Sequence, residues 1–145
     1  MTATSKFTEA QVKSVLSRMP YSKLIGVKPL LMGHELTLIM PYSQEVIGNP
    51  VLPALHGGAV SAFMELTAIT QLALQGGHTK LPKPVGVNID YLRRGKPMDT
   101  YARALVAREG KRVANVRVRA WQESFNEPIS MLHGHFMAAR QKSNG

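Results

Sequence analysis

A single carboxylate stands out in an apolar part of the sequence. Glu65 is the only formally charged residue between Glu45 and Lys80, and it lies in the middle of residues 55–75, which otherwise have the composition of a buried helix. An ionised carboxylate there is costly unless it is paired, hydrated or neutralised by a raised pKa, so a chain that keeps one is expected to use it. Such a group could attack a carbonyl carbon or activate water. The alternative is a structural glutamate that reaches water at a helix edge or an interface.

Two glycines open the same stretch, directly after His56. A helix N-terminus presents unpaired N–H groups and the positive end of the helix dipole, so Gly57 and Gly58 could stabilise an oxyanion on an attacked carbonyl. The alternative is that the glycines only let the chain turn tightly into the helix. His56 could shuttle protons, although beside a Gly-Gly helix start we favour a capping or packing role.

The spacing of these residues has a consequence for assembly. Eight helical residues separate Gly57 from Glu65 and rise about 12 Å, whereas a reacting carbonyl must lie within about 3 Å of its oxyanion donor. If both residues are catalytic, two antiparallel helices must meet across a subunit interface, and each site takes Gly57 from one chain and Glu65 from the other. We therefore expect a homodimer or homotetramer with interfacial active sites. Gly58 and Ser61 share the helical face of Glu65, where their small side chains could leave room for substrate or equally permit close helix packing.

The first half of the chain is expected to surround this central helix with short elements. A capping box at Thr8 to Gln11 predicts an amphipathic helix over about 8–19, closed by Pro20. Residues 25–40 predict two strands with a turn near Gly33. Residues 41–53 contain too many prolines and glycines for regular structure.

The second half is expected to consist of strands. The central helix is predicted over about 57–75, with a stop at Gly76-Gly77. Alternation of apolar and polar residues then predicts strands joined by short turns, at about 85–91, 101–108, 112–122 and 128–139. Successive hairpins make an antiparallel sheet, and the long helix is the only candidate to cover one face of it. This α+β arrangement, a curved sheet around one helix, is the hotdog architecture, and we expect residues 1–145 to form a single such domain.

Composition narrows the possible partners and sites. The 145 residues include 18 Lys and Arg against nine Asp and Glu, a net charge of +9, which suggests a polyanionic partner such as nucleic acid, an anionic membrane or a phosphorylated small molecule. The absence of cysteine excludes disulfides, thiolate nucleophiles and cysteine-ligated metals. His133 and His135 have no acidic partner nearby in sequence, so we expect no metal and no cofactor. The polar start predicts a cytoplasmic protein, and the polar residues within 55–75 favour a buried helix over a membrane span.

The residues Asn49, Leu55-His56-Gly57-Gly58 and an acid eight positions after Gly57 resemble the hotdog-fold acyl-CoA thioesterases. The resemblance is closest to the PaaI-like branch, which includes the 4-hydroxybenzoyl-CoA thioesterases, and covers about residues 20 to 140. It implies hydrolysis of an acyl-CoA to coenzyme A and a free carboxylic acid. The Gly57 N–H would bind the thioester carbonyl, Glu65 would be the nucleophile or the base that activates water, and Asn49 would help hold the carbonyl or the water. Many PaaI-like members have Asp in place of Glu65.

Basic residues could bind the leaving group of such a substrate. Coenzyme A carries a pyrophosphate and a 3′-phosphate, and Arg93, Arg94 and Lys96 follow a predicted strand, where they could bind these groups together with Lys111 or Arg112. The resemblance places this region beside the coenzyme A entrance. For each of these residues a solvated loop is the alternative.

Two other functions stay open at the level of sequence. A hotdog hydratase or dehydratase acting on acyl thioesters would pair a catalytic histidine with the acid, and His56 is the candidate near the motif. A non-catalytic module could bind acyl-CoA, or nucleic acid through Arg117, Arg119 and Trp121 on one strand face, although nucleic acid is the less favoured partner. Nothing in the sequence selects the acyl group.

Overall fold

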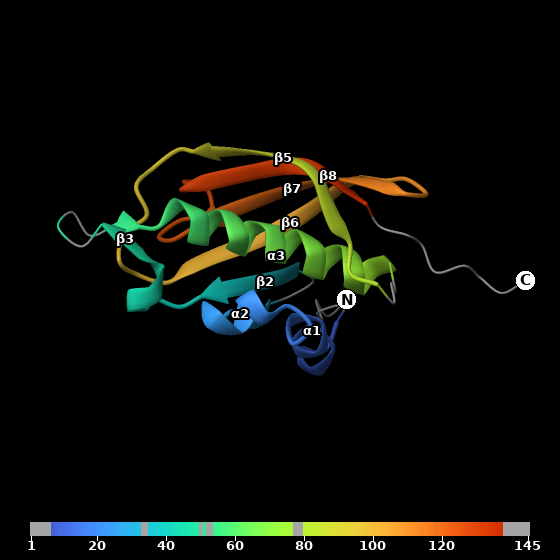
Figure 1. Ribbon diagram of the computed structural model, residues 1–145, viewed down its shortest axis with the longest axis horizontal. Helices are drawn as coiled ribbons and strands as arrows, with labels where there is room; N and C mark the ends of the chain where they lie inside the picture. Colours follow the sequence, from blue (N-terminus) through green and yellow to red (C-terminus); the bar gives the residue numbers. More distant parts are fainter. Residues whose placement is uncertain (1–6, 33–34, 50, 52–53, 77–79, 138–145) are drawn as a thin grey trace, which may run out of the picture.

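The computed structural model describes residues 7–32, 35–49, 51, 54–76 and 80–137. A six-stranded antiparallel sheet wraps around one long helix, α3 (Gly57–Gly76), which lies along its inner face (Figure 1). The predicted α+β hotdog fold is confirmed. The central helix has the predicted start and ends within one residue of the predicted end, while Gly77 lies outside the described residues.

The order of strands in the sheet differs in one respect from a chain of hairpins. The order is β1-β2-β6-β7-β8-β5, formed by β1 (Lys28–Met32), β2 (Glu35–Met40), β6 (Thr100–Glu109), β7 (Val113–Trp121), β8 (Ser130–Met137) and β5 (Lys83–Tyr91). Strands β6, β7 and β8 are successive hairpin neighbours, as predicted. The prediction was wrong for β5, which pairs with β8 at the sheet edge. The connection 92–99 must therefore pass the ends of β8 and β7 to reach β6.

The N-terminal segment forms two helices rather than one. Helix α1 (Glu9–Leu16) has the predicted capping box, in which Thr8 and Gln11 exchange hydrogen bonds. It ends three residues before the predicted boundary, and Pro20 opens a second helix, α2 (Pro20–Leu24). Proline fits the first turn of a helix because its missing N–H would have no intrahelical partner there. Pro20 is thus a start signal as well as a stop signal.

The segment before α3 has more regular structure than its prolines suggested. A 3-10 helix, η1 (Gln44–Val46), leads into β3 (Ile47–Asn49), which pairs with β4 (Ala54–Leu55). The prediction of an irregular segment was wrong here because two strands of two or three residues are too short to give a periodic pattern. The predicted turn at Gly33 lies outside the described residues.

The hydrophobic core lies between α3 and the inner face of the sheet. Alternate residues of β7 face this core, and Val116 and Val118 are buried as their alternation predicts. From α3, Phe63 and Leu72 are fully buried and belong to the same core cluster. Although α3 is long and apolar enough to cross a membrane, 56% of its 18-residue apolar window is buried inside the fold. That burial is typical of the core helix of a soluble domain.

Candidate functional site

The N-terminus of α3 has one backbone donor for which no described residue supplies an acceptor. Ala59 and Val60 donate their N–H groups to the His56 carbonyl oxygen at 3.0 and 3.1 Å, and the Gly58 N–H donates to Nδ1 of His56 at 2.9 Å. The Gly57 N–H has no acceptor among the residues that the structure describes. The other three of the first four donors have acceptors among the described residues, so the Gly57 N–H is the one left open to a ligand in this part of the chain, at the positive end of the helix dipole.

His56 acts as the cap of this helix. Its imidazole is exposed, and Nδ1 accepts the Gly58 N–H. Gly58 is also close to the ring, because a Cβ at this position would come within 2.9 Å of His56 Cε1. The capping role favoured from sequence therefore accounts for the imidazole. The Gly58 N–H, engaged with that ring, is not available as a second oxyanion donor while the cap is in place.

Neighbouring segments hold the start of α3 in position. The Leu55 N–H donates to the Gly95 carbonyl oxygen at 2.9 Å, and the Tyr91 hydroxyl donates to the Gly57 carbonyl oxygen at 3.1 Å. A Cβ on Gly57 would meet the Tyr91 ring at 3.5 Å, an ordinary contact, so the position tolerates a methyl group. Sequence reasoning missed Tyr91, because its place at the end of an alternating strand carries no sign of this contact.

Glu65 lies half-buried on α3 and has no partner among the described residues. Its carboxylate makes no ion pair or hydrogen bond with any residue in the described part of the chain. Removal from water raises the pKa of Glu65 above its ordinary value of 4.5. Ser61, one turn earlier, is also half-buried and faces the same side. The carboxylate thus has the environment of a base or nucleophile and performs no visible structural function.

Gly57 and Glu65 lie far apart along α3, as their spacing in the sequence predicted. Gly57 and Glu65 belong to the same regular helix, so about 12 Å of axial rise lies between them. The structure does not bring them together within one chain. The buried hydroxyls of Thr67 and Thr70 donate to helix carbonyl oxygens at 2.8 and 2.7 Å, and neither is directed to Glu65 by these bonds.

Three of the predicted basic residues do meet in one cleft. Arg93, Arg94 and Lys96 line a cavity of about 370 Å³ beside the 92–99 connection. Two carboxylates also line it, and one of them, Glu123, lies 3.0 Å from the Lys96 ammonium. Sequence reasoning missed Glu123, which follows a strand without any motif around it.

The remaining predicted residues lie elsewhere. Lys111 and Arg112 occupy the turn between β6 and β7, at the end of the fold where Gln75 of α3 donates to Glu109. Within one chain they are at the opposite end of α3 from Gly57. The backbone of Asn49 closes β3 and pairs with Ala54, whereas its side chain lies outside the described part of the structure.

The outer face of the sheet carries the arginines considered for nucleic acid. Trp121 stacks on Tyr101, with ring centroids 5.9 Å apart, and the Arg103 guanidinium lies 5.3 Å from the Trp121 ring. Arg119 lies 4.6 Å from the Phe125 ring. The chain's own side chains therefore occupy the aromatic surfaces that a stacking platform would need. Among the described residues, no three His, Asp or Glu side chains gather as a metal site would require.

Solved structures with the same fold come from several bacteria. A Pseudomonas aeruginosa protein is 28% identical with a TM-score of 0.76, and the match covers 89% of this chain and 97% of that one. A Bacillus halodurans protein solved with CoA is 18% identical with a TM-score of 0.75, covering 95% and 99%. The PaaI protein of the E. coli phenylacetic acid degradation operon is 16% identical with a TM-score of 0.72, covering 90% and 94%. At these identities the last two matches show the fold.

Sequence comparison identifies the family. No curated protein matches the chain. The family model of the thioesterase superfamily matches residues 52–129, more than half of the sequence, including β4, α3 and the strands up to the start of β8. The chain belongs to the thioesterase superfamily.

Proposed function

We propose that the protein is an acyl-CoA thioester hydrolase, which releases coenzyme A and a free carboxylic acid. The observation that carries this proposal is the open N–H of Gly57 at the start of a 20-residue helix. When a thioester carbonyl is attacked, its oxygen becomes negative, and a fixed N–H at a helix N-terminus stabilises that charge. The fold shared with a structure that holds CoA and the match to the thioesterase superfamily support the same substrate class.

Glu65 supplies the attack in one of two ways. As a base, it takes a proton from water while the water oxygen attacks the carbonyl carbon. As a nucleophile, it attacks that carbon itself and forms an anhydride, which water then hydrolyses. In both cases the C–S bond breaks, the sulfur leaves with the electron pair and is protonated, and the acid is released.

The active site forms between two subunits in this proposal. Strand β5 lies at the edge of the sheet (Figure 1). It is nine residues long and mostly exposed. A long unprotected edge is suited to pairing with a second strand. Antiparallel pairing of two β5 strands would continue the sheet and set the two α3 helices antiparallel. Gly57 of one chain would then approach the carboxylate of Glu65 of the partner subunit.

A test of shared sites uses two inactive variants. Gly57→Pro removes the N–H at the first helical position, where proline is tolerated, and Glu65→Gln removes the carboxylate. Each homodimer should keep about 1% of the wild-type activity or less in thiol release from a panel of acyl-CoA substrates. Co-expressed chains should recover about a quarter of the wild-type activity, because half of the dimers are mixed and each mixed dimer has one intact site. No recovery would mean that the two residues do not combine across subunits.

A matched variant controls for steric effects in this test. Gly57→Ala keeps the N–H, and its methyl group fits at 3.5 Å from Tyr91, so it should keep most of the activity.

The same preparations should be assayed with enoyl and 3-hydroxyacyl thioesters by absorbance. Turnover of these without thiol release would favour the hydratase alternative. An absence of thiol release from every acyl-CoA would contradict the proposed function.

A further inference from the structure

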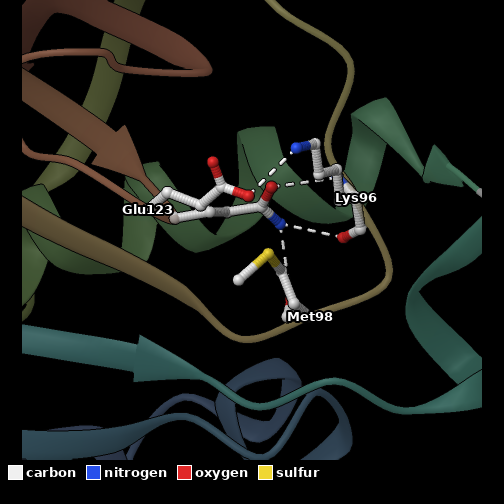
Figure 2. Close-up of polar contacts among 4 residues, drawn as sticks. Lys96, Met98 and Glu123 are labelled. Carbon is white, nitrogen blue, oxygen red and sulfur yellow. Dashed lines mark hydrogen bonds and ion pairs between the residues drawn. The ribbon is translucent and has the colours of Figure 1, made fainter.

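Gln122 makes an unusual number of hydrogen bonds for one side chain. It is only 7% exposed and lies directly after β7. Its Oε1 accepts the Lys96 N–H at 2.9 Å, and its Nε2 donates to the Lys96 carbonyl oxygen at 2.9 Å and to Thr100 Oγ1 at 3.1 Å. A longer contact of 3.4 Å reaches the Met98 carbonyl oxygen (Figure 2). The buried side-chain amide of Gln122 thus binds both the backbone N–H and the backbone carbonyl oxygen of Lys96.

The loop held in this way has no regular secondary structure and runs past the ends of β8 and β7. Residues 92–99 connect the edge strand β5 to β6, which lies three strand positions away in the sheet. The N–H groups of Leu92 and Arg93 donate to the Ile129 carbonyl oxygen at 2.8 and 3.1 Å, near the start of β8. Gln122 then fixes the loop as it passes the end of β7. Without Gln122, the second half of the loop would lose its central attachment to the sheet.

The same loop contacts both parts of the proposed site. It carries Arg93, Arg94 and Lys96, which line the 370 Å³ cleft. It also supplies the Gly95 carbonyl oxygen to the Leu55 N–H, two residues before Gly57. Gln122 therefore acts on the basic groups directly, whereas the start of α3 is held by the Gly95–Leu55 hydrogen bond, in which Gln122 takes no part.

A second residue after β7 opposes the binding of an anion in this cleft. The Glu123 carboxylate lies 3.0 Å from the Lys96 ammonium, and both side chains are more than half exposed (Figure 2). Glu127 adds a second carboxylate to the lining. An incoming phosphate must displace Glu123 from Lys96 or share the ammonium with it. An exposed pair of this kind is weak, so such an exchange is feasible.

We propose that Gln122 is a positioning residue that holds the 92–99 loop so that its cations meet the phosphates of coenzyme A, and that Glu123 weakens this binding by occupying Lys96. The inference rests on the proposed function and deepens it, since it makes the loop the element that distinguishes CoA thioesters from thioesters without phosphates. It predicts effects of opposite sign from two adjacent residues. A merely structural role of both would predict loss in both variants.

The first test replaces the amide by a side chain of similar length. Gln122→Met removes the hydrogen bonds, and the KM for an acyl-CoA should rise about tenfold, with kcat changed much less. The N-acetylcysteamine thioester of the same acyl group has no phosphates, and its kcat/KM should stay within about twofold of the wild-type value. Equal losses on both thioesters would overturn the positioning role. Thermal unfolding of the variant checks that it folds.

The second test removes a charge at the surface, where folding is not at risk. Glu123→Gln frees Lys96, and the KM for the acyl-CoA should fall about threefold while that of the N-acetylcysteamine thioester stays constant. Glu9→Gln is the matched control, because Glu9 forms a similarly exposed pair with Lys13, at 2.9 Å, on α1. An equal KM in Glu123→Gln and Glu9→Gln would remove Glu123 from the proposal.

Binding without turnover separates this inference from the proposed function. Calorimetry with coenzyme A and with pantetheine should show weaker binding of coenzyme A, and unchanged binding of pantetheine, in Gln122→Met. This pattern in a protein that hydrolyses no acyl-CoA would leave the loop assignment standing and overturn the enzymatic one. Hydrolysis of acyl-CoA with no preference over the N-acetylcysteamine thioester would support the enzymatic function and overturn the loop assignment.

Discussion

The two sides of helix α3 differ in how completely the rest of the chain covers them. On the side turned away from Glu65, Val60, Phe63 and Thr67 are buried in the core. On the other side Ser61, Glu65 and Ile69, spaced one turn apart, are only half-buried. Packing within one chain accounts for the first side and does not account for a carboxylate on the second.

This difference separates stability from activity along a single helix. A substitution on the packed side should lower the free energy of unfolding and leave the chemistry of folded molecules intact. A substitution of Glu65 should do the opposite, because no described residue depends on its carboxylate. The following variants test whether the two sides are as independent as the structure indicates.

The largest effect is expected from Glu65→Gln. Removing the attacking or proton-accepting group should lower kcat for thiol release at least about 1,000-fold, which corresponds to about 4 kcal/mol of barrier. The circular dichroism spectrum and the cooperativity of unfolding should not change. Activity within tenfold of the wild type would show that the half-covered side of α3 is not catalytic.

A complementary effect on stability is expected from Phe63→Ala on the packed side. Loss of a fully buried phenylalanine side chain leaves a cavity and should reduce the free energy of unfolding by about 3 kcal/mol, measured by urea denaturation. Below the unfolding transition, kcat per folded molecule should stay close to that of the wild type. A large fall in kcat without a change in stability would mean that the core side also shapes the site.

The sequence predicts the two sides of α3 by different signals. The packed side follows from apolar spacing, whereas the other side is marked by the isolation of one charge, Glu65, in an apolar stretch. The connection 92–99 could not be predicted, because β5 pairs with β8 and this non-local pairing leaves no local pattern. For the same reason Tyr91 and Gln122 were missed, since their roles depend on contacts with residues 34 and 26 positions away. Local periodicity gives the elements, and the contacts across the sheet complete the candidate site.

The N-terminus of α3 allows the same comparison of activity with stability for a backbone group, the Gly57 N–H. Gly57→Pro removes one N–H and should lower kcat about 100-fold, or about 2.7 kcal/mol, whereas Gly57→Ala should retain activity within a few-fold. Both variants should unfold at nearly the same temperature, since the missing N–H has no acceptor among the described residues. Equal activity of the two variants would exclude the Gly57 N–H as the oxyanion donor.

The smallest effect concerns the pH dependence of stability. Because burial raises the pKa of Glu65, the folded state holds the proton more tightly than the unfolded state does. Below the unfolded pKa both states are protonated and ionisation costs nothing, and as the pH rises through the higher folded pKa the wild type loses stability. Glu65→Gln cannot ionise, so it should be more stable than the wild type at neutral pH, and the difference should shrink towards acidic pH. Urea midpoints of the two proteins, measured in parallel across this range, cancel the contributions of every other titrating group. A wild type that gains stability relative to Glu65→Gln as the pH rises would mean that the carboxylate has a cationic partner in the assembled protein.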